Sequence, residues 1–212
     1  MPRPSNTDER RSQIVDGLQA VMATQGYERA TIAEIAKAAS LTPGLVHYHF
    51  ESKQQILLAL IERLAGVWRS RAAAEATDDD DRRARLGQLL DAWLGLDARA
   101  DAAAVACWVT LSGEALRQPA VRELYVAALR EAKAALEHAV REVLESEQRA
   151  TAEAAAIAAA LMAAIQGYLQ LGVLAAGLVP RASAARTLRT MAHGAIDAQR
   201  SAAQRATKAG KR

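Results

Sequence analysis

Apolar residues recur three and four positions apart along almost the whole chain, the spacing that places them on one face of an α-helix. In the first segment, Ile14, Leu18 and Met22 form such a stripe, which predicts a helix over residues 7–25. Gly26 follows at a position suited to a left-handed helix end. The sequence has no apolar–polar alternation typical of strands, so we expect an all-α fold of about nine helices.

Three short patterns mark helix starts in the next part of the chain. Thr31 followed by Glu34, and Ser52 followed by Gln55, match the capping box. In this motif the side chain of the first residue accepts from the backbone N–H of the fourth, and the side chain of the fourth accepts from the backbone N–H of the first. Thr42 before Pro43 combines a hydroxyl cap with proline at the first helical position. These patterns predict helices over 32–39, 43–50 and 53–75.

The rest of the chain predicts five longer helices. With Asp81 as the cap of the first, they are expected over 82–98, 102–116, 119–145, 154–176 and 183–200. Residues 154–180 carry no charge, and a segment of this length could span a bilayer, but nearly half of its apolar residues are alanine. We therefore expect a buried or interface helix and no membrane segment.

Charge by itself does not indicate nucleic-acid binding. The 212 residues carry a net charge of +3, but residues 181–212 hold eight basic groups and one acidic group, so the excess lies in the C-terminal tail. Residues 1–53 hold six basic and six acidic residues.

The single cysteine, Cys107, excludes an internal disulfide and fits a reducing, cytoplasmic location.

The two short helices over 32–39 and 43–50 are joined by three residues, which predicts a helix-turn-helix. Helical geometry places Val46 and Phe50 together on the inner face of the second helix. Its outer face, expected to read DNA, then holds Gly44, Leu45, His47 and Tyr48, with Pro43 and His49 at the margins. Thr31, Thr42 and Lys53 stand at helix starts around it, where phosphate contacts are expected.

The runs Thr31–Ala39 and Leu41–Lys53 resemble the DNA-binding domain of the TetR family of transcriptional repressors, a similarity that covers roughly residues 8–60. The shared pattern is T-I-x-x-I-A, then S/T-x-G-x-L/V, then Y/H-F-x-x-K. Two positions depart from it. Ser40 stands where the family usually has glycine, and His47 stands where an aromatic residue is common.

The resemblance implies a DNA-binding domain over 1–52, a ligand-binding and dimerising domain over 53–200, and a basic, disordered tail over 201–212. It implies a homodimeric repressor that binds a pseudo-palindromic double-stranded operator and leaves it when a small-molecule effector binds. The C-terminal half also resembles choline-responsive members of the family, through Trp108, Gln118–Pro119 and Ile165–Gly167.

Aromatic and polar side chains between the later helices are candidates for the effector site, namely Trp68, Trp93, Trp108, Met162 and Gln166. For each of these residues, simple packing in the hydrophobic core explains its presence equally well. The last two helices are expected to form the dimer interface through Leu161, Ile165, Tyr168, Leu169, Gly172, Leu188, Met191 and Ile196.

Two other classes of function stay open at this point. The chain could be a helical carrier or enzyme whose first helices are scaffold, or a protein that coats DNA through its basic tail. The sequence contains no phosphate-binding glycine loop, nucleophile elbow or metal-ligand spacing. We therefore expect a protein that is not an enzyme and needs no metal or cofactor.

Overall fold

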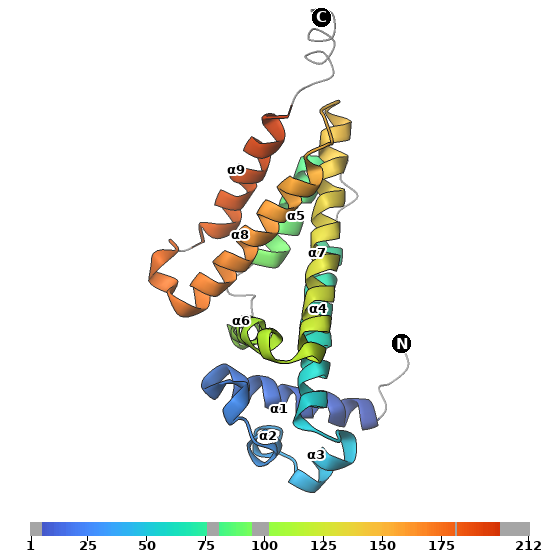
Figure 1. Cartoon of the computed structure of the whole chain (residues 1–212), viewed down its shortest axis with the longest axis vertical. Coiled ribbons are helices and arrows are strands. Elements are labelled where there is room, and N and C mark those ends of the chain that lie inside the picture. The colour runs from blue at the N-terminus through green and yellow to red at the C-terminus, as the bar shows by residue number, and fades with distance from the viewer. Residues whose placement is uncertain (1–5, 76–80, 95–101, 181, 200–212) are drawn as a thin grey trace, which may run out of the picture. The chain divides into compact units, whose positions relative to one another are not determined.

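The computed structural model describes residues 6–75, 81–94, 102–180 and 182–199. Within these ranges the chain forms nine α-helices and one short 3₁₀ helix, with no strand (Figure 1). The predicted all-α fold is therefore confirmed. The basic tail predicted over 201–212 lies outside the described residues.

The chain divides into two compact units. Unit 1 comprises Met1–Val67 and Ala100–Ala127, and unit 2 comprises Trp68–Arg99 and Ala128–Arg212. The division falls inside α4 (Lys53–Glu75) and α7 (Pro119–Ser146), so both helices contribute residues to both units. The functional boundary expected at residue 52 stays a prediction.

Unit 1 is built around α1 (Asn6–Arg29), which packs against α2 (Ile32–Ala38), α3 (Pro43–His49) and α6 (Ala102–Arg117). The stripe predicted from the sequence forms its core, since Ile14, Leu18 and Met22 are buried. The other helices add buried side chains to this core, among them Ile35, Val46, Leu57, Leu60, Trp108 and Leu111. The helix-turn-helix therefore shares one core with α6.

Unit 2 contains α5 (Arg82–Leu94), the later part of α7, α8 (Ala154–Leu174), η1 (Ala176–Leu178) and α9 (Ala184–Asp197). α9 packs against both α5 and α8, and Figure 1 shows α8 and α9 side by side. Apolar side chains from all four helices fill the core, among them Leu86, Leu90, Leu136, Val140, Leu161 and Leu188.

An arginine–carboxylate cluster ties three segments of unit 2 together. The Arg83 guanidinium donates to both carboxylate oxygens of Glu147 and to Asp197 Oδ1, and Arg149 Nε donates to Glu147 Oε2 at 2.8 Å. The hydrogen bond from Arg83 lowers the pKa of Glu147 to about 2. The cluster thus joins the start of α5, the end of α7 and the end of α9.

Within the described residues the helix boundaries agree with the sequence patterns to within a few residues, with two informative differences, while the predicted helical residues 95–98 and 200 lie outside the described ranges. Gly26 adopts the expected positive φ of 79°, but Tyr27–Arg29 add a further helical stretch after it. Gln55 N donates to Ser52 Oγ at 3.2 Å, whereas Gln55 Oε1 accepts from Glu51 N, so only half of that predicted capping box forms. Asp81 caps α5 as predicted, accepting from Arg83 N at 2.9 Å.

α8 is long and apolar enough to cross a membrane, judged by length and composition. Within unit 2, however, one of its faces is buried, with Ile157, Leu161, Ile165 and Leu169 in the core. Its other face is exposed and carries no charge. A charge-free helix with one face in a core and one face exposed is typical of an interface helix.

Candidate nucleic-acid interface

α3 is anchored by its first and last residues and by its inner face. Leu45 N donates to the hydroxyl of Thr42 at 3.3 Å, and Pro43 occupies the first turn, as the sequence predicted. Val46 and Phe50 are 0% and 1% exposed. One buried side chain within the seven-residue helix, Val46, and one at its C-cap, Phe50, fix which face of α3 points outward.

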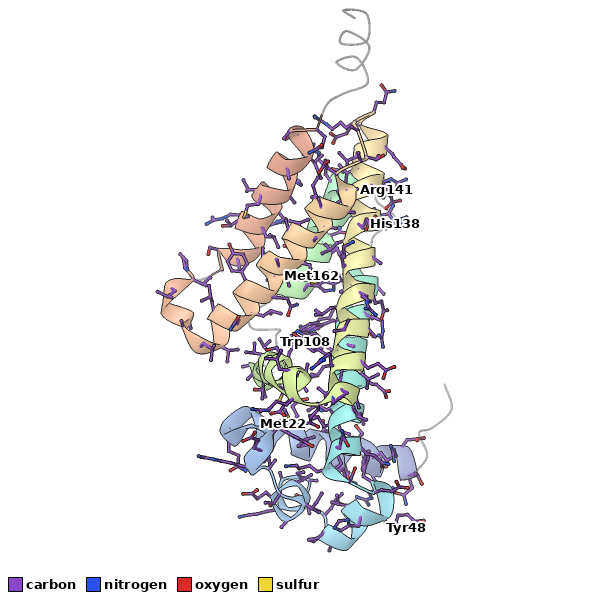
Figure 2. The ribbon with its side chains drawn as sticks, viewed as in Figure 1. Met22, Tyr48, Trp108, His138, Arg141 and Met162 are labelled. Atoms are coloured by element: carbon purple, nitrogen blue, oxygen red, sulfur yellow. The ribbon has the colours of Figure 1, made fainter. Side chains whose placement is uncertain are left out.

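The outer face of α3 is accessible. Gly44, His47 and Tyr48 are exposed, and Leu45 and His49 are half-buried at its edges. Tyr48 is 81% exposed, and Figure 2 shows it on the outer side of unit 1. Its ring meets the His49 imidazole edge-on, with 5.0 Å between ring centres. Gly44 and the polar side chains of His47 and Tyr48, which are suited to approach base edges, thus lie on one exposed face of α3.

Arg11 holds the C-terminal end of α3 against α1. Its guanidinium donates to the carbonyl oxygen of His49 at 2.5 Å and lies 4.0 Å from the centre of the Phe50 ring. A cation at a helix C-terminus satisfies free carbonyl groups and interacts favourably with the helix dipole. The sequence analysis did not single out Arg11, because its partners are 38 and 39 residues away.

The turn between α2 and α3 begins with a left-handed residue. Ser40 has a φ of 56°, and its N–H donates to Lys37 O while Leu41 N–H donates to Ala36 O at 2.8 Å. This pair of bonds is the Schellman motif, which usually has glycine at the left-handed position. The departure from the family pattern at Ser40 therefore falls where backbone strain is expected.

α1 and α2 approach each other closely at Gly17. A β-carbon built there would lie 2.6 Å from the Ile35 carbonyl oxygen and 3.0 Å from the Ala39 β-carbon. Only glycine allows this separation. A glycine inside an otherwise regular helical stripe was the available signal in the sequence, although the pattern does not say which helix approaches it.

Thr31 forms the complete capping box that the sequence predicted. Glu34 N donates to the Thr31 hydroxyl at 3.2 Å, and Thr31 N donates back to Glu34 Oε2 at 2.9 Å. These bonds to Thr31 lower the pKa of the Glu34 carboxyl. Thr31 is exposed, so its expected phosphate contact stays a prediction.

Lys53 hydrogen-bonds to the end of α1, and its expected phosphate contact stays a prediction. Its Nζ donates to the carbonyl oxygens of Tyr27 and Ala30, each at 2.9 Å, and to that of Glu28 at 3.4 Å. It also lies 4.3 Å from the centre of the Tyr27 ring. The ammonium group thus closes the C-terminal end of α1.

The effector candidates are divided between the units. Trp108 belongs to unit 1, is 1% exposed and stacks on Tyr125 with 4.7 Å between ring centres. Burial raises the pKa of Tyr125 to about 12. Trp68, Trp93, Met162 and Gln166 belong to unit 2, where Gln166 Nε2 lies 3.7 Å from Met162 Sδ. Sequence reasoning missed Tyr125 as the partner of Trp108.

The residues predicted for the dimer interface differ in how far they are exposed within one chain, and their contact with a second copy stays a prediction. Five of its eight side chains are between 0% and 4% exposed within one chain, namely Leu161, Ile165, Leu169, Leu188 and Ile196. They pack into the core of unit 2, because the apolar stripe of α8 and of α9 first serves the contacts of these helices with each other and with α5. Tyr168 and Gly172 are half-buried, and Met191 is exposed.

Comparison with known proteins identifies the family. Residues 14–60 match the model of the bacterial regulatory proteins of the tetR family, and residues 82–197 match the C-terminal model of the BetI-type transcriptional repressors. The chain belongs to the TetR family. Its C-terminal part is of the BetI type, and this match alone covers more than half of the chain.

Relatives with known names agree with this membership. The chain is 35% identical over 126 residues to the HTH-type transcriptional regulator BetI of Rhizobium meliloti, covering 59% of this chain and 62% of that protein. It is 26% identical over 125 residues to the BetI regulator of Burkholderia thailandensis, covering 64% of that protein. The chain thus aligns with less than two thirds of the length of these relatives.

Solved structures share the fold. A transcriptional regulator of Rhodococcus sp. Rha1 superimposes with a TM-score of 0.75 at 21% identity, covering 89% of this chain and 97% of the other. A regulator of Saccharomonospora viridis, solved in complex with choline, has a TM-score of 0.75 at 25% identity and covers 90% of this chain and 97% of the other.

Proposed function

We propose that this chain is a homodimeric transcriptional repressor that binds a pseudo-palindromic operator and is released by a small-molecule effector. The observation that carries the proposal is the state of α3, whose inner side chains Val46 and Phe50 are buried while Tyr48 is 81% exposed. A helix held in this way, after a short turn, fits the recognition helix of a helix-turn-helix.

The proposed DNA-contacting residues have separate roles. Gly44 lets the helix approach the groove closely, and Leu45 offers a methyl surface to thymine. His47, Tyr48 and His49 offer polar groups to base edges, while Thr31, Thr42 and Pro43 lie where the backbone phosphates pass. Lys53, the first residue of α4, is also proposed to contact a backbone phosphate.

The test uses three alanine variants on an operator obtained by selecting a random duplex library with the full chain. We expect His47→Ala and Tyr48→Ala each to weaken binding by about 1–3 kcal/mol, the range for one base contact. His138→Ala is the matched control, since this imidazole lies on α7 and its side chain is 75% exposed. Equal affinity of all three variants and the parent would overturn the placement of α3.

We propose that α8, η1 and α9 pair with the same helices of a second copy. The support is a group of exposed apolar side chains on these elements, namely Leu171, Val173, Leu174, Leu178 and Met191. Tyr168 and Gly172 from the original prediction lie on the same helix. Exposed apolar side chains that adjoin each other on a charge-free helix are typical of a protein–protein contact.

Leu174→Arg tests this pairing, because Leu174 is 70% exposed and arginine would place a charge inside the proposed contact. Leu116→Arg is the control, since Leu116 is 78% exposed on α6 in unit 1. Sedimentation equilibrium should give a dimer for the parent and for Leu116→Arg, and a monomer for Leu174→Arg. A dimer that survives Leu174→Arg would show that another surface holds it.

For the effector we propose a small organic cation of the quaternary ammonium class. The support comes from the choline complex of the S. viridis regulator and from the aromatic residues Trp68, Trp93 and Trp108, since aromatic faces attract such cations. Choline should raise the melting temperature of the chain, because a ligand that binds only the native state stabilises it. The neutral isostere 3,3-dimethyl-1-butanol should raise it far less, and an equal shift would refute the charge requirement.

Deleting residues 201–212 separates this proposal from the second DNA-binding hypothesis, the coating of DNA by the basic tail. A repressor keeps its operator specificity after the deletion, whereas a coating protein loses its binding. A carrier or enzyme without DNA binding would select no sequence from the library. We also propose a cytoplasmic location, where the operator is found.

A further inference from the structure

We propose that Arg11 of α1 is a positioning residue for the recognition helix. It holds the last turn of α3, and with it Tyr48 and His49, in the orientation that operator binding requires. This inference rests on the proposed operator binding and adds a residue of α1 to it.

α3 is too short to keep its own shape. It spans seven residues, Pro43–His49, and isolated helices shorter than about 12–15 residues are marginal in water. Its start is fixed by Thr42, whose hydroxyl accepts a hydrogen bond from Leu45 N at 3.3 Å. Its last turn carries Tyr48 and His49, two of the proposed DNA contacts. The orientation of these two side chains therefore depends on what holds the C-terminal end of the helix.

Arg11 holds that end by two contacts of different kinds. Its Nη1 donates to the carbonyl oxygen of His49 at 2.5 Å, and its guanidinium carbon lies 4.0 Å from the centre of the Phe50 ring. The last carbonyl groups of a helix have no partner within the helix, and a cation there also interacts favourably with the helix dipole. Phe50 is the C-cap of α3 and is 1% exposed, so its ring is fixed in the core. The guanidinium thus joins a fixed ring to the free end of the helix.

The backbone that carries Arg11 is itself held by the core of unit 1. Arg11 lies one turn before Ile14 and Val15, which are 0% and 5% exposed. Figure 1 shows the N-terminal part of α1 beside the end of α3. Removing the guanidinium leaves the buried anchors of α3 in place but frees its last turn. Tyr48 and His49 would then sample several orientations, and part of the binding free energy would be spent on ordering them.

The neighbouring Arg10 offers a matched control. It follows the same helix and carries the same charge, but its Nη1 donates to Gln13 Oε1 at 2.8 Å, within α1. Methionine keeps an unbranched apolar side chain and removes the cation. Arg10→Met therefore measures the loss of one cation from this part of α1, whereas Arg11→Met also removes the contact with α3.

The first measurement needs no DNA. Hydrogen exchange followed by NMR in the full chain reports on the amide of Phe50, bonded at 2.9 Å in the last turn of α3, and on that of Leu45 in the first turn. We expect Arg11→Met to speed exchange at Phe50 by about tenfold or more, the fold-change for one hydrogen bond to a charged group, and at Leu45 by less than about twofold. Arg10→Met should leave both rates near those of the parent. Unchanged exchange at Phe50 in Arg11→Met would overturn the inference.

The second measurement uses the selected operator and a scrambled duplex over a series of salt concentrations. We expect Arg11→Met to bind the operator about tenfold more weakly than Arg10→Met, the size of a lost base contact, and the scrambled duplex less than about twofold more weakly. The slope of the logarithm of affinity against the logarithm of salt concentration should be the same in both variants. A phosphate contact of Arg11 would instead lower that slope by about 0.9 and weaken both duplexes alike, and this result would also overturn the inference.

Arg11→Lys separates geometry from charge. Lysine keeps the positive charge but has no planar group to lie on the Phe50 ring. Exchange at Phe50 and operator affinity should change together in Arg11→Met and Arg11→Lys. Operator affinity that lysine restores while exchange at Phe50 stays fast would contradict a positioning role, and so would fast exchange with unchanged operator affinity. If the parent selects no operator, the proposed function fails, and the exchange rates still decide whether Arg11 holds α3.

Discussion

The contact between α1 and α2 at Gly17 makes the sharpest quantitative prediction. In Gly17→Ala the added β-carbon would lie 2.6 Å from the Ile35 carbonyl oxygen. That oxygen belongs to the backbone, and it also accepts a hydrogen bond from Ala39 N at 2.9 Å, so it cannot rotate away as a side chain can. The two helices must therefore separate.

The expected magnitude is the difference between two terms. Overpacking in a core costs about 1–3 kcal/mol, and a contact with backbone belongs at the upper end of that range. Alanine recovers about 1 kcal/mol through its higher helix propensity. We therefore expect a net loss of about 1–2 kcal/mol in the free energy of unfolding, which corresponds to a fall of about 2–8 °C in melting temperature for a chain of this size.

The assay pairs Gly17→Ala with Gly113→Ala. Gly113 lies within α6, and a β-carbon there would have no neighbour within 4 Å. The same substitution should therefore stabilise the protein by about 1 kcal/mol through helix propensity alone. Urea unfolding and thermal melting of both variants measure the two effects, and opposite signs are expected.

A functional consequence follows from the same geometry. Because α2 leads into α3, folded Gly17→Ala should also bind the operator about tenfold more weakly, equivalent to about 1.4 kcal/mol. If Gly17→Ala is as stable as Gly113→Ala, the close approach of α1 and α2 is wrong and the reasoning is refuted. If stability falls but operator affinity is unchanged, α2 does not control α3.

Two further predictions concern strain in the turn and charge in unit 2. Ser40→Gly removes a left-handed cost of about 1–2 kcal/mol and adds about 0.5–1 kcal/mol of unfolded-state entropy, so thermal melting should show a net gain of about 0.5–1 kcal/mol. Ser12→Gly, in the regular part of α1, should lose about 0.5 kcal/mol, and equal signs would exclude strain at Ser40. The pKa of Glu147 falls from 4.5 to about 2 on folding, so its contribution is complete above the unfolded pKa and is lost as the pH falls towards 2. Since this carboxylate is partly exposed, Glu147→Gln should cost about 1–2 kcal/mol at pH 7 in urea unfolding, and the difference from the parent should shrink below pH 4. A difference that stays constant down to pH 3 would show that the ion pair with Arg83 is not its source.

Local patterns predicted the helix-turn-helix well. The cap at Thr31, the Thr42–Pro43 start and the inward pair Val46 and Phe50 each depend on residues within four positions of one another. Backbone geometry decides such features almost without regard to the rest of the fold. The positive φ at Gly26 was predictable for the same reason.

The interface and effector residues were harder to predict, because an apolar stripe shows that a face is covered but not what covers it. Leu161 and Leu188 were expected to face a second copy, and both are buried within one chain. Leu174 and Leu178, which the stripe did not include, are 70% and 74% exposed. Trp108, whose place beside an effector stays a prediction, stacks on Tyr125, a partner that the sequence pattern does not show.

The sequence by itself determined the all-α class, the positions of the helix starts and the outward face of α3, since hydrogen bonds and periodicity over a few residues decide them. Only the tertiary structure decided the hydrogen bonds of Lys53 with the end of α1, the need for glycine at position 17 and the placing of Arg11 on the end of α3. Each of these depends on atoms that lie 18 or more residues apart in the chain, and their distance is decided by how the helices pack.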